Sequence, residues 1–269
     1  MQASVFNLRV PLESSRDVFL MNTMSEAQLI VSHDVATLLE RFEQPVDEVA
    51  LGELSADERD AVALLEENGF IVPDRHAERA ERDRFFVTTK ASTEELHITV
   101  LTTLQCNFAC DYCYQGDRGD HNKFAEKMSI ETAHRVADWI ERELDTVRPK
   151  KLHIMFFGGE PLLNLPVMYL IAERMAATTR ARGLKQSISI VTNGLLLSEE
   201  IVDRMNAYGL LGVKITLDGD RDTHNRMRPL RGGQGTFDRI IANIRKVAHK
   251  TRVGIGGNYD ESTFESYPA

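Results

Sequence analysis

The chain is almost free of cysteine. Its 269 residues contain three, and all of them lie in the octet from Cys106 to Cys113. The rest of the chain therefore offers no thiolate for a second metal centre and no partner for a disulfide framework. Unpaired thiols are typical of proteins in a reducing compartment.

Long apolar runs are also missing. No stretch approaches the roughly 20 apolar residues that span a bilayer, and the first 15 residues lack the basic and then apolar pattern of a secretory signal. The sequence therefore predicts a protein without a membrane span, and the cytoplasm is its expected location.

Positive charge is in deficit. The chain has 32 basic and 41 acidic side chains, a formal net charge of −9. A surface of this sign repels a polyphosphate backbone unless a local basic patch overrides it. Nucleic acid is therefore not the expected partner.

The cysteine octet follows the apolar run 96–104. Thiolates at Cys106, Cys110 and Cys113 can hold three corners of an iron–sulfur cube, whereas full ligation by protein would take a fourth cysteine. One iron would then be open to a small molecule. Two other interpretations remain: a structural zinc site completed by His121, and thiols buried as small hydrophobes. Structural zinc sites usually combine two short cysteine-containing segments, and this chain has one. The polar neighbour Asp111 argues against a buried apolar segment, so the sequence favours the iron–sulfur cube.

The first part of the chain predicts a small α+β domain over residues 1–73. Apolar runs at 18–21 and 28–31 flank a polar turn and indicate a hairpin. Apolar spacing predicts helices over 35–42 and 61–65, the second after the N-cap signal Ser55-x-x-Glu58. Residues 74–83 are almost all polar or charged. This pattern predicts a charged linker over residues 74–93, or a surface helix.

From His97 onward, apolar strands alternate with amphipathic helices, which is the pattern of parallel βα units and of the α/β class. Five strands are expected, the last over 252–257, with helices over 129–145, 166–182, 198–208 and 237–249. In a barrel of parallel strands, ligands gather at the loops that follow the carboxyl ends of the strands.

Four motifs stand at such ends, each directly after an apolar strand. In chain order they are Cys106-x3-Cys110-x-Tyr112-Cys113-Tyr114, Gly158-Gly159-Glu160-Pro161, Thr192-Asn193-Gly194 and Leu217-Asp218-Gly219. Together they resemble the signature of the radical S-adenosylmethionine (SAM) superfamily. The resemblance implies a partial parallel (β/α) barrel of radical SAM type over residues 94–269.

The resemblance also implies two cofactors. A [4Fe-4S] cluster would be held by Cys106, Cys110 and Cys113, which are both its metal ligands and the centre of catalysis. SAM would chelate the fourth iron through its amino and carboxylate groups. An external low-potential donor would supply an electron, and cleavage of SAM would give a 5′-deoxyadenosyl radical that abstracts hydrogen from the substrate.

The same resemblance assigns the glycine motif to SAM. Gly158 and Gly159 would allow the backbone to approach the methionyl group, Glu160 would support the carbonyls that receive the ammonium, and Pro161 would fix the exit of the loop. Taken alone, the motif is also typical of a strand-to-helix turn. Tyr112 is expected to cover the cluster or to flank the adenine.

Four further residues are expected at the cofactor by resemblance. Asn193 would make a polar contact with SAM, and Thr216 would bind the methionine carboxylate. Asp218 would orient its loop, and Arg228 would reach the SAM carboxylate with its fork of donors. A simple turn at Asn193 and a solvated loop arginine at 228 are the alternatives. His153 and His224 are expected to be structural.

The branch that the chain resembles most modifies peptides and proteins, as in the SPASM-type and anaerobic sulfatase maturase-like enzymes. Its members often begin with a winged-helix-like domain that recognises a leader peptide as an added strand. Residues 18–73 have the size and position of such a domain. A plain accessory domain that caps the barrel is the alternative.

The sequence departs from that branch after its fifth strand. Relatives continue into a sixth βα unit and a cysteine-rich extension for auxiliary clusters, whereas this chain stops at Ala269. We therefore expect a C-terminally truncated form with an incomplete core and an unpaired strand edge.

The predicted function is maturation of a peptide or protein by hydrogen abstraction. Two alternatives stay open. One is a radical SAM enzyme acting on a small molecule or RNA, and the other is a truncated, non-catalytic protein that binds peptides as a scaffold.

Overall fold

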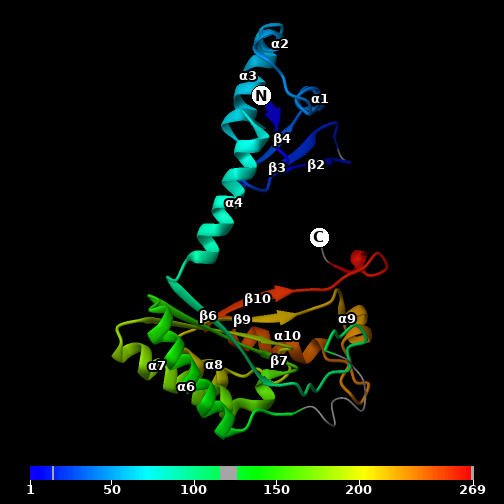
Figure 1. Cartoon of the computed structure of the whole chain (residues 1–269). Coiled ribbons are helices and arrows are strands. Elements are labelled where there is room, and N and C mark those ends of the chain that lie inside the picture. Colours follow the sequence, from blue (N-terminus) through cyan, green and yellow to red (C-terminus); the bar gives the residue numbers. More distant parts are fainter. Residues whose placement is uncertain (14, 116–125, 268–269) are drawn as a thin grey trace. The chain divides into compact units, whose positions relative to one another are not determined.

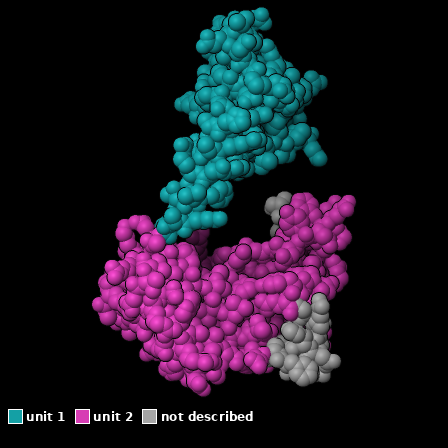
Figure 2. Space-filling model, in the orientation of Figure 1, with its two compact units in different colours: residues 1–92 teal, residues 93–269 magenta. Residues whose placement is uncertain are grey.

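The computed structural model describes residues 1–13, 15–115 and 126–267. The chain forms two compact units, residues 1–92 and 93–269 (Figure 2). Each unit has its own cluster of buried hydrophobic residues.

The strands of the first unit form two small antiparallel sheets. In the larger sheet, strand β3 lies between β2 and β4, and β3 and β4 form the predicted hairpin. One face of the hairpin is buried, with Leu20 fully inaccessible, and the other leaves Ile30 exposed. The bounds are β1 (Gln2–Ala3), β2 (Asn7–Pro11), β3 (Val18–Asn22), β4 (Gln28–Val31) and β5 (Ile71–Val72), and β1 pairs with β5.

The helices of this unit are α1 (His33–Glu40), α2 (Glu48–Gly52), α3 (Ala56–Glu67) and α4 (Arg75–Ala91). Helix α3 begins with the predicted capping box, in which Ser55 and Glu58 bind each other's backbone N–H groups. Helix α4 occupies most of the charged stretch 74–93. Its Glu78 is buried and accepts hydrogen bonds from the Ser4 hydroxyl and, at 3.2 Å, from the Val5 N–H. This contact attaches α4 to the rest of the first unit, which spans residues 1–92.

The second unit is built on a five-stranded parallel sheet of order β10-β9-β8-β7-β6. Strands that follow each other in the chain are therefore neighbours in space, and all their carboxyl ends meet at one edge (Figure 1). The bounds are β6 (Glu95–Thr103), β7 (Lys151–Gly158), β8 (Lys185–Thr192), β9 (Leu210–Thr216) and β10 (Arg252–Gly256).

The helices that connect these strands are α6 (Ile130–Val147), α7 (Leu165–Ala181), α8 (Glu199–Asn206), α9 (Arg221–Met227) and α10 (Phe237–Val247), with short 3₁₀ turns η1 (Pro161–Asn164) and η2 (Phe264–Ser266). The predicted α/β class and all five predicted strands are confirmed. Elements β1, β2, α2 and α9 were not predicted.

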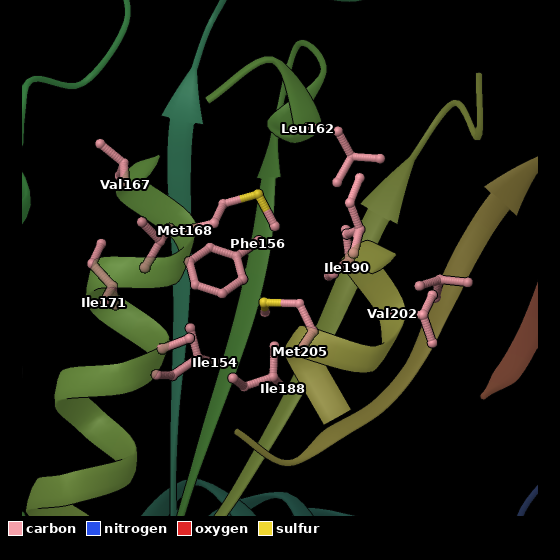
Figure 3. Packing of buried hydrophobic residues seen from close by; sticks show 14 of the residues in the cluster. Ile154, Phe156, Leu162, Val167, Met168, Ile171, Ile188, Ile190, Val202 and Met205 are labelled. Atoms are coloured by element: carbon pink, nitrogen blue, oxygen red, sulfur yellow. The ribbon is translucent and has the colours of Figure 1, made fainter. Parts of the chain in front are cut away.

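Side-chain alternation along the strands separates the two faces of the sheet. Along β7, buried and partly exposed residues alternate, and Ile154 and Phe156 are among those that are fully buried. Figure 3 shows these side chains packed against Met168 of α7 and Met205 of α8. Burying one face under helices leaves the loops at the carboxyl edge as the place for a site.

No helix in the described ranges is both long and apolar enough to cross a membrane.

Candidate functional site

A cavity of about 340 Å³ opens at the carboxyl edge of the sheet, which is a size typical of small-molecule sites. It is lined by residues from five loops: Leu104, Cys106, Phe108, Ala109, Cys110, Tyr112, Cys113, Tyr114, Gln115, Phe157, Gly158, Gly159, Val191, Thr192, Asn193, Thr216, Arg228, Arg231 and Asn258. The structure therefore brings together nine of the predicted site residues. Glu160, Pro161 and Asp218 do not line the cavity.

The three cysteines occupy the loop that follows β6, and all are half-buried. The loop is held from within by Phe108, which is buried in the core. It is held from outside by a short antiparallel pairing with the segment after α9, in which Ala109 N–H donates to Pro229 O at 2.9 Å and Arg231 N–H donates to Asn107 O at 3.2 Å. The thiols are thus presented on a fixed backbone.

Burial raises the pKa of Cys106, and it raises the pKa of Cys110 to about 11. These thiols are protonated at neutral pH when no cation is near. Binding of iron would release their protons, because the thiolate is the ligand.

In the part of the chain that the structure describes, no three His, Cys, Asp or Glu side chains are placed to hold a single metal ion. That arrangement is compatible with a cube, in which each cysteine binds a different iron. The alternative zinc ligand, His121, lies outside the described residues.

The glycine motif packs directly on the cysteine loop. A Cβ atom on Gly158 would lie 2.2 Å from the Thr103 carbonyl oxygen, and one on Gly159 would lie 2.3 Å from the Gln105 carbonyl oxygen. Gly158 also has a φ of +133°, where a side chain is strained. Hydrogen bonds from Gly159 N–H to Thr103 O and from Glu160 N–H to Gln105 O close this contact. The two glycines therefore allow the loop after β7 to approach the backbone of the loop after β6.

Glu160 lies beneath the cavity and is fully buried. Its carboxylate accepts hydrogen bonds from the N–H groups of Leu162 and Asn193 and from the Thr192 hydroxyl, at 2.8 to 2.9 Å. Burial raises its pKa, while these three donors act in the opposite direction. Glu160 therefore ties the loop after β7 to the loop after β8, and Pro161 opens the 3₁₀ turn η1 beside it.

Asn193 reaches from the loop after β8 to the cysteine loop. Its side-chain N–H donates to Asn107 Oδ1 at 2.7 Å, and its own oxygen accepts from Leu195 N–H at 3.0 Å. Thr216 ends strand β9 and lines the same cavity. Both residues thus line the cavity with polar side chains.

A polar network joins the buried Asp218 and Arg228 to the more exposed Tyr112 and Asn258. The Tyr112 hydroxyl donates to Asp218 and accepts from Arg228 Nη1 and, at 3.2 Å, from Asn258 Nδ2. Asn258 N–H also donates to Asp218 at 2.8 Å. Burial raises the pKa of Tyr112, so its hydroxyl keeps the proton that it donates.

Arg228 is 9% exposed, and its Nε has no hydrogen-bond partner among the residues that the structure describes. A buried donor without a partner is costly. Arg228 also lines the cavity, and the guanidinium group is suited to pairing with a carboxylate.

The two histidines with possible roles lie away from the cavity. His224 is fully buried; its Nδ1 accepts from Asp218 N–H, and its Nε2 lies 3.1 Å from the Thr236 hydroxyl oxygen. His153 contacts two serine hydroxyls on the neighbouring strand. Their contacts are those of structural residues.

The sequence did not single out Arg231 or Asn258 as cavity residues. Asn258 follows the fifth strand, so the rule that ligands gather at carboxyl ends would have flagged it. Arg231 precedes Gly232-Gly233 and belongs to none of the four motifs, so no comparable signal marked it.

The residues present fit a cluster and SAM. The donor set consists of three thiols on one fixed loop, and an arginine and several residues with side-chain amides line the same cavity. The chain matches the family model described as the Radical SAM superfamily over residues 100–260. The chain belongs to the radical SAM superfamily. This superfamily uses a [4Fe-4S] cluster and SAM.

Curated relatives of this superfamily member differ in what their names say they make. Fe-coproporphyrin III synthase of Methanosarcina barkeri is 28% identical over 170 residues, which are 62% of this chain and 38% of that protein. The serine-type anaerobic sulfatase-maturating enzyme of Bacteroides thetaiotaomicron is 26% identical over 141 residues, which are 52% of this chain and 33% of that protein. The chain thus spans less than half the length of these relatives.

Among solved structures, native anSMEcpe with bound AdoMet and Cp18Cys peptide matches with a TM-score of 0.50 at 24% identity. The match covers 60% of this chain and 42% of that chain. It supports the radical SAM fold of the second unit.

Proposed function

We propose that the protein is a radical SAM enzyme that modifies a peptide or protein. The observation that carries the proposal is the convergence of three half-buried cysteines and the guanidinium-bearing Arg228 on one cavity. The peptide class is supported by a relative named as a sulfatase-maturating enzyme and by a structural neighbour with a bound peptide.

When bound, the cluster and SAM supply the radical chemistry that removes a hydrogen atom from the substrate. The chain itself places them. The three thiolates would hold the irons, the Arg228 guanidinium would pair with the SAM carboxylate, and Asn193 and Thr216 would offer polar contacts to the same molecule. Phe108 and Phe157 make part of the cavity wall apolar, which excludes water from the reacting groups.

The electron would come from an external low-potential donor. A reducing, oxygen-poor cytoplasm suits the thiol chemistry of this site.

The first unit is the proposed site for the substrate's leader. Strand β4 is an edge of its sheet, and its Val31 shares a hydrophobic core with Val62 and Leu65 of α3. An extended peptide could add to β4 as a further strand, with backbone hydrogen bonds giving affinity and side-chain pockets giving choice. The exposed Ile30 of β4 offers apolar surface for this contact.

Anaerobic reconstitution with iron and sulfide tests the proposal. The wild-type chain should become brown and, with a reductant, convert SAM to 5′-deoxyadenosine. Cys110→Ala should lose iron and this product, while Asp111→Asn, an exposed change in the same loop outside the cavity, should keep both. A colourless wild-type protein, or a Cys110→Ala variant as active as wild type, would count against the proposal.

A second candidate is modification of a small molecule, and the similarity to Fe-coproporphyrin III synthase favours it. It differs in what it requires of residues 1–92. If the substrate is a small molecule, deleting this unit leaves substrate choice unchanged, whereas a leader-guided enzyme loses its preference for leader-bearing peptides. A protein that binds leader peptides but cleaves no SAM under any reductant would instead be a scaffold.

A further inference from the structure

Tyr112 stands between two opposite charges at the edge of the cavity. Its hydroxyl accepts a hydrogen bond from Arg228 Nη1 and donates one to Asp218 Oδ2. Arg228 Nη1 and Asp218 Oδ2 are 3.6 Å apart, which is longer than an ordinary hydrogen bond. The hydroxyl therefore links the guanidinium to the carboxylate while keeping them from direct hydrogen bonding.

The backbone of Arg228 is fixed without help from Tyr112. Its N–H donates to His224 O at 2.8 Å, and its carbonyl oxygen accepts from the Thr236 hydroxyl at 2.8 Å. Thr236 is itself within 3.1 Å of His224 Nε2. Only the guanidinium end of the side chain therefore depends on the tyrosine hydroxyl.

The cysteine loop is also fixed by other contacts. Phe108 anchors it in the core, and the backbone pairing with residues 229–231 holds Asn107 and Ala109. Removing one oxygen atom from Tyr112 should thus leave both the thiols and the fold in place.

We propose that Tyr112 is a positioning residue for SAM, which acts by holding the Arg228 guanidinium away from Asp218 so that it can pair with a carboxylate in the cavity. The inference rests on the proposed function, because it assumes that Arg228 meets the SAM carboxylate. It adds Tyr112 to the residues that serve this function, and Tyr112 acts through Arg228 and does not contact SAM in this role.

Charge explains the direction of the effect. Asp218 is fully buried and Arg228 almost so, and opposite charges attract more strongly where water is excluded. Without the hydroxyl between them, the guanidinium moves onto Asp218 and forms a direct ion pair. It then has to leave that pair before it can bind SAM.

The first experiment measures SAM affinity in the iron-loaded, full-length protein. Tyr112→Phe should keep the iron and sulfide content of wild type and bind SAM about tenfold more weakly, a loss typical of a hydrogen bond to a charged group. Tyr169→Phe is the matched control, since this residue lies on α7 outside the cavity and should bind SAM as wild type does. Unchanged affinity in Tyr112→Phe, or a loss of iron that accounts for the weaker binding, would overturn the proposal.

A double-mutant cycle tests whether the effect passes through Arg228. Arg228→Gln alone should weaken SAM binding, and Tyr112→Phe/Arg228→Gln should bind no more weakly than Arg228→Gln. Additive losses would show that Tyr112 acts on SAM by another route and would refute the positioning role.

A third measurement needs no cofactor. In a crystal structure of Tyr112→Phe without cluster or SAM, the Arg228–Asp218 separation should shorten from 3.6 Å to hydrogen-bond distance. A guanidinium that keeps its place would contradict the proposal. Failure of the proposed function appears instead in the wild-type protein, as an absence of iron loading or of SAM binding, so the two failures are distinguishable.

Discussion

At the scale of single residues, Gly159 has no room for a side chain. A Cβ atom there would lie 2.3 Å from Gln105 O and 2.6 Å from Leu104 O, and both of these atoms belong to backbone that leads into the cysteine loop. The loops after β6 and β7 would have to separate. A side chain at residue 159 would therefore also shift the cysteine loop and the three thiols that it carries.

We predict that Gly159→Ala lowers the free energy of unfolding by about 1 to 3 kcal/mol, the usual cost of overpacking, and reduces iron loading. Denaturant unfolding and iron analysis of reconstituted protein measure the two effects. Gly254→Ala is the control, because the nearest atom to its added Cβ is 3.9 Å away. Equal behaviour of the two variants would contradict the prediction.

His224 gives a residue-scale prediction about pH. Burial lowers its pKa from 6.5 to about 4. The unfolded chain therefore takes up a proton first as the pH falls, and stability present above pH 6.5 is lost between pH 6.5 and about 4.

This group alone should make the folded state about 2 kcal/mol less stable at pH 5 than at pH 7.5. Urea unfolding at the two pH values measures the difference. His224→Gln, which cannot titrate, should show a smaller pH dependence by that amount. An unchanged pH dependence in the variant would show that His224 does not cause it.

Sequence reasoning reached the cysteines because three thiolates in one octet have few other uses, and the structure places all three at one cavity. Glu160 shows what such reasoning does not reach. Two of its three hydrogen bonds come from residues more than 30 positions away in the chain, and no local sequence pattern predicts them. The Tyr112 contacts with Arg228 and Asp218 also depend on tertiary structure, since they span more than 100 positions.

At the scale of elements, helix α10 supports the loop that carries Asn193. The side chain of Asn243 donates to Gly194 O at 3.0 Å and to Leu195 O at 2.9 Å. A helix on the covered face of the sheet thereby fixes a loop at the cavity.

Asn243→Ala should lower the free energy of unfolding by about 1 to 3 kcal/mol, because it removes both donors from these two carbonyl groups. Denaturant unfolding measures the loss. Asn206→Ala, which removes one exposed hydrogen bond to Lys250 O, should change stability by less than about 0.5 kcal/mol. Similar losses in both variants would argue against a supporting role for α10.

The predicted elements are those with a strong apolar period or a cap signal, such as the β3–β4 hairpin and the capped helix α3. The missed elements lack both. Helix α9 contains one apolar residue, Met227, and depends on its N-cap Asp220 and on tertiary contacts of buried His224. Strand β2 was missed because its apolar residues, including Leu8 and Val10, are exposed and the strand ends at a proline.

At the scale of the whole molecule, the chain divides at Ser92 into two units with separate cores. Lys90 is exposed at the end of α4, next to this division. Exposed backbone between compact units is where proteases cut first.

Brief digestion with trypsin should therefore give two resistant fragments that separate after Lys90, identified by mass spectrometry. Lys90→Gln removes this cleavage site and should delay the appearance of fragments with that terminus. Early cleavage within β6 to β10 instead would contradict the division.

The division also separates the charge. Residues 1–92 contain 18 of the 41 acidic and 9 of the 32 basic side chains, so they account for the whole formal net charge of −9. Residues 93–269 are balanced and lie near their isoelectric point at neutral pH, where proteins associate and precipitate most readily. The first unit therefore acts as a built-in solubility tag for the unit that carries the cysteines, and removing it should lower the concentration at which the remainder stays in solution.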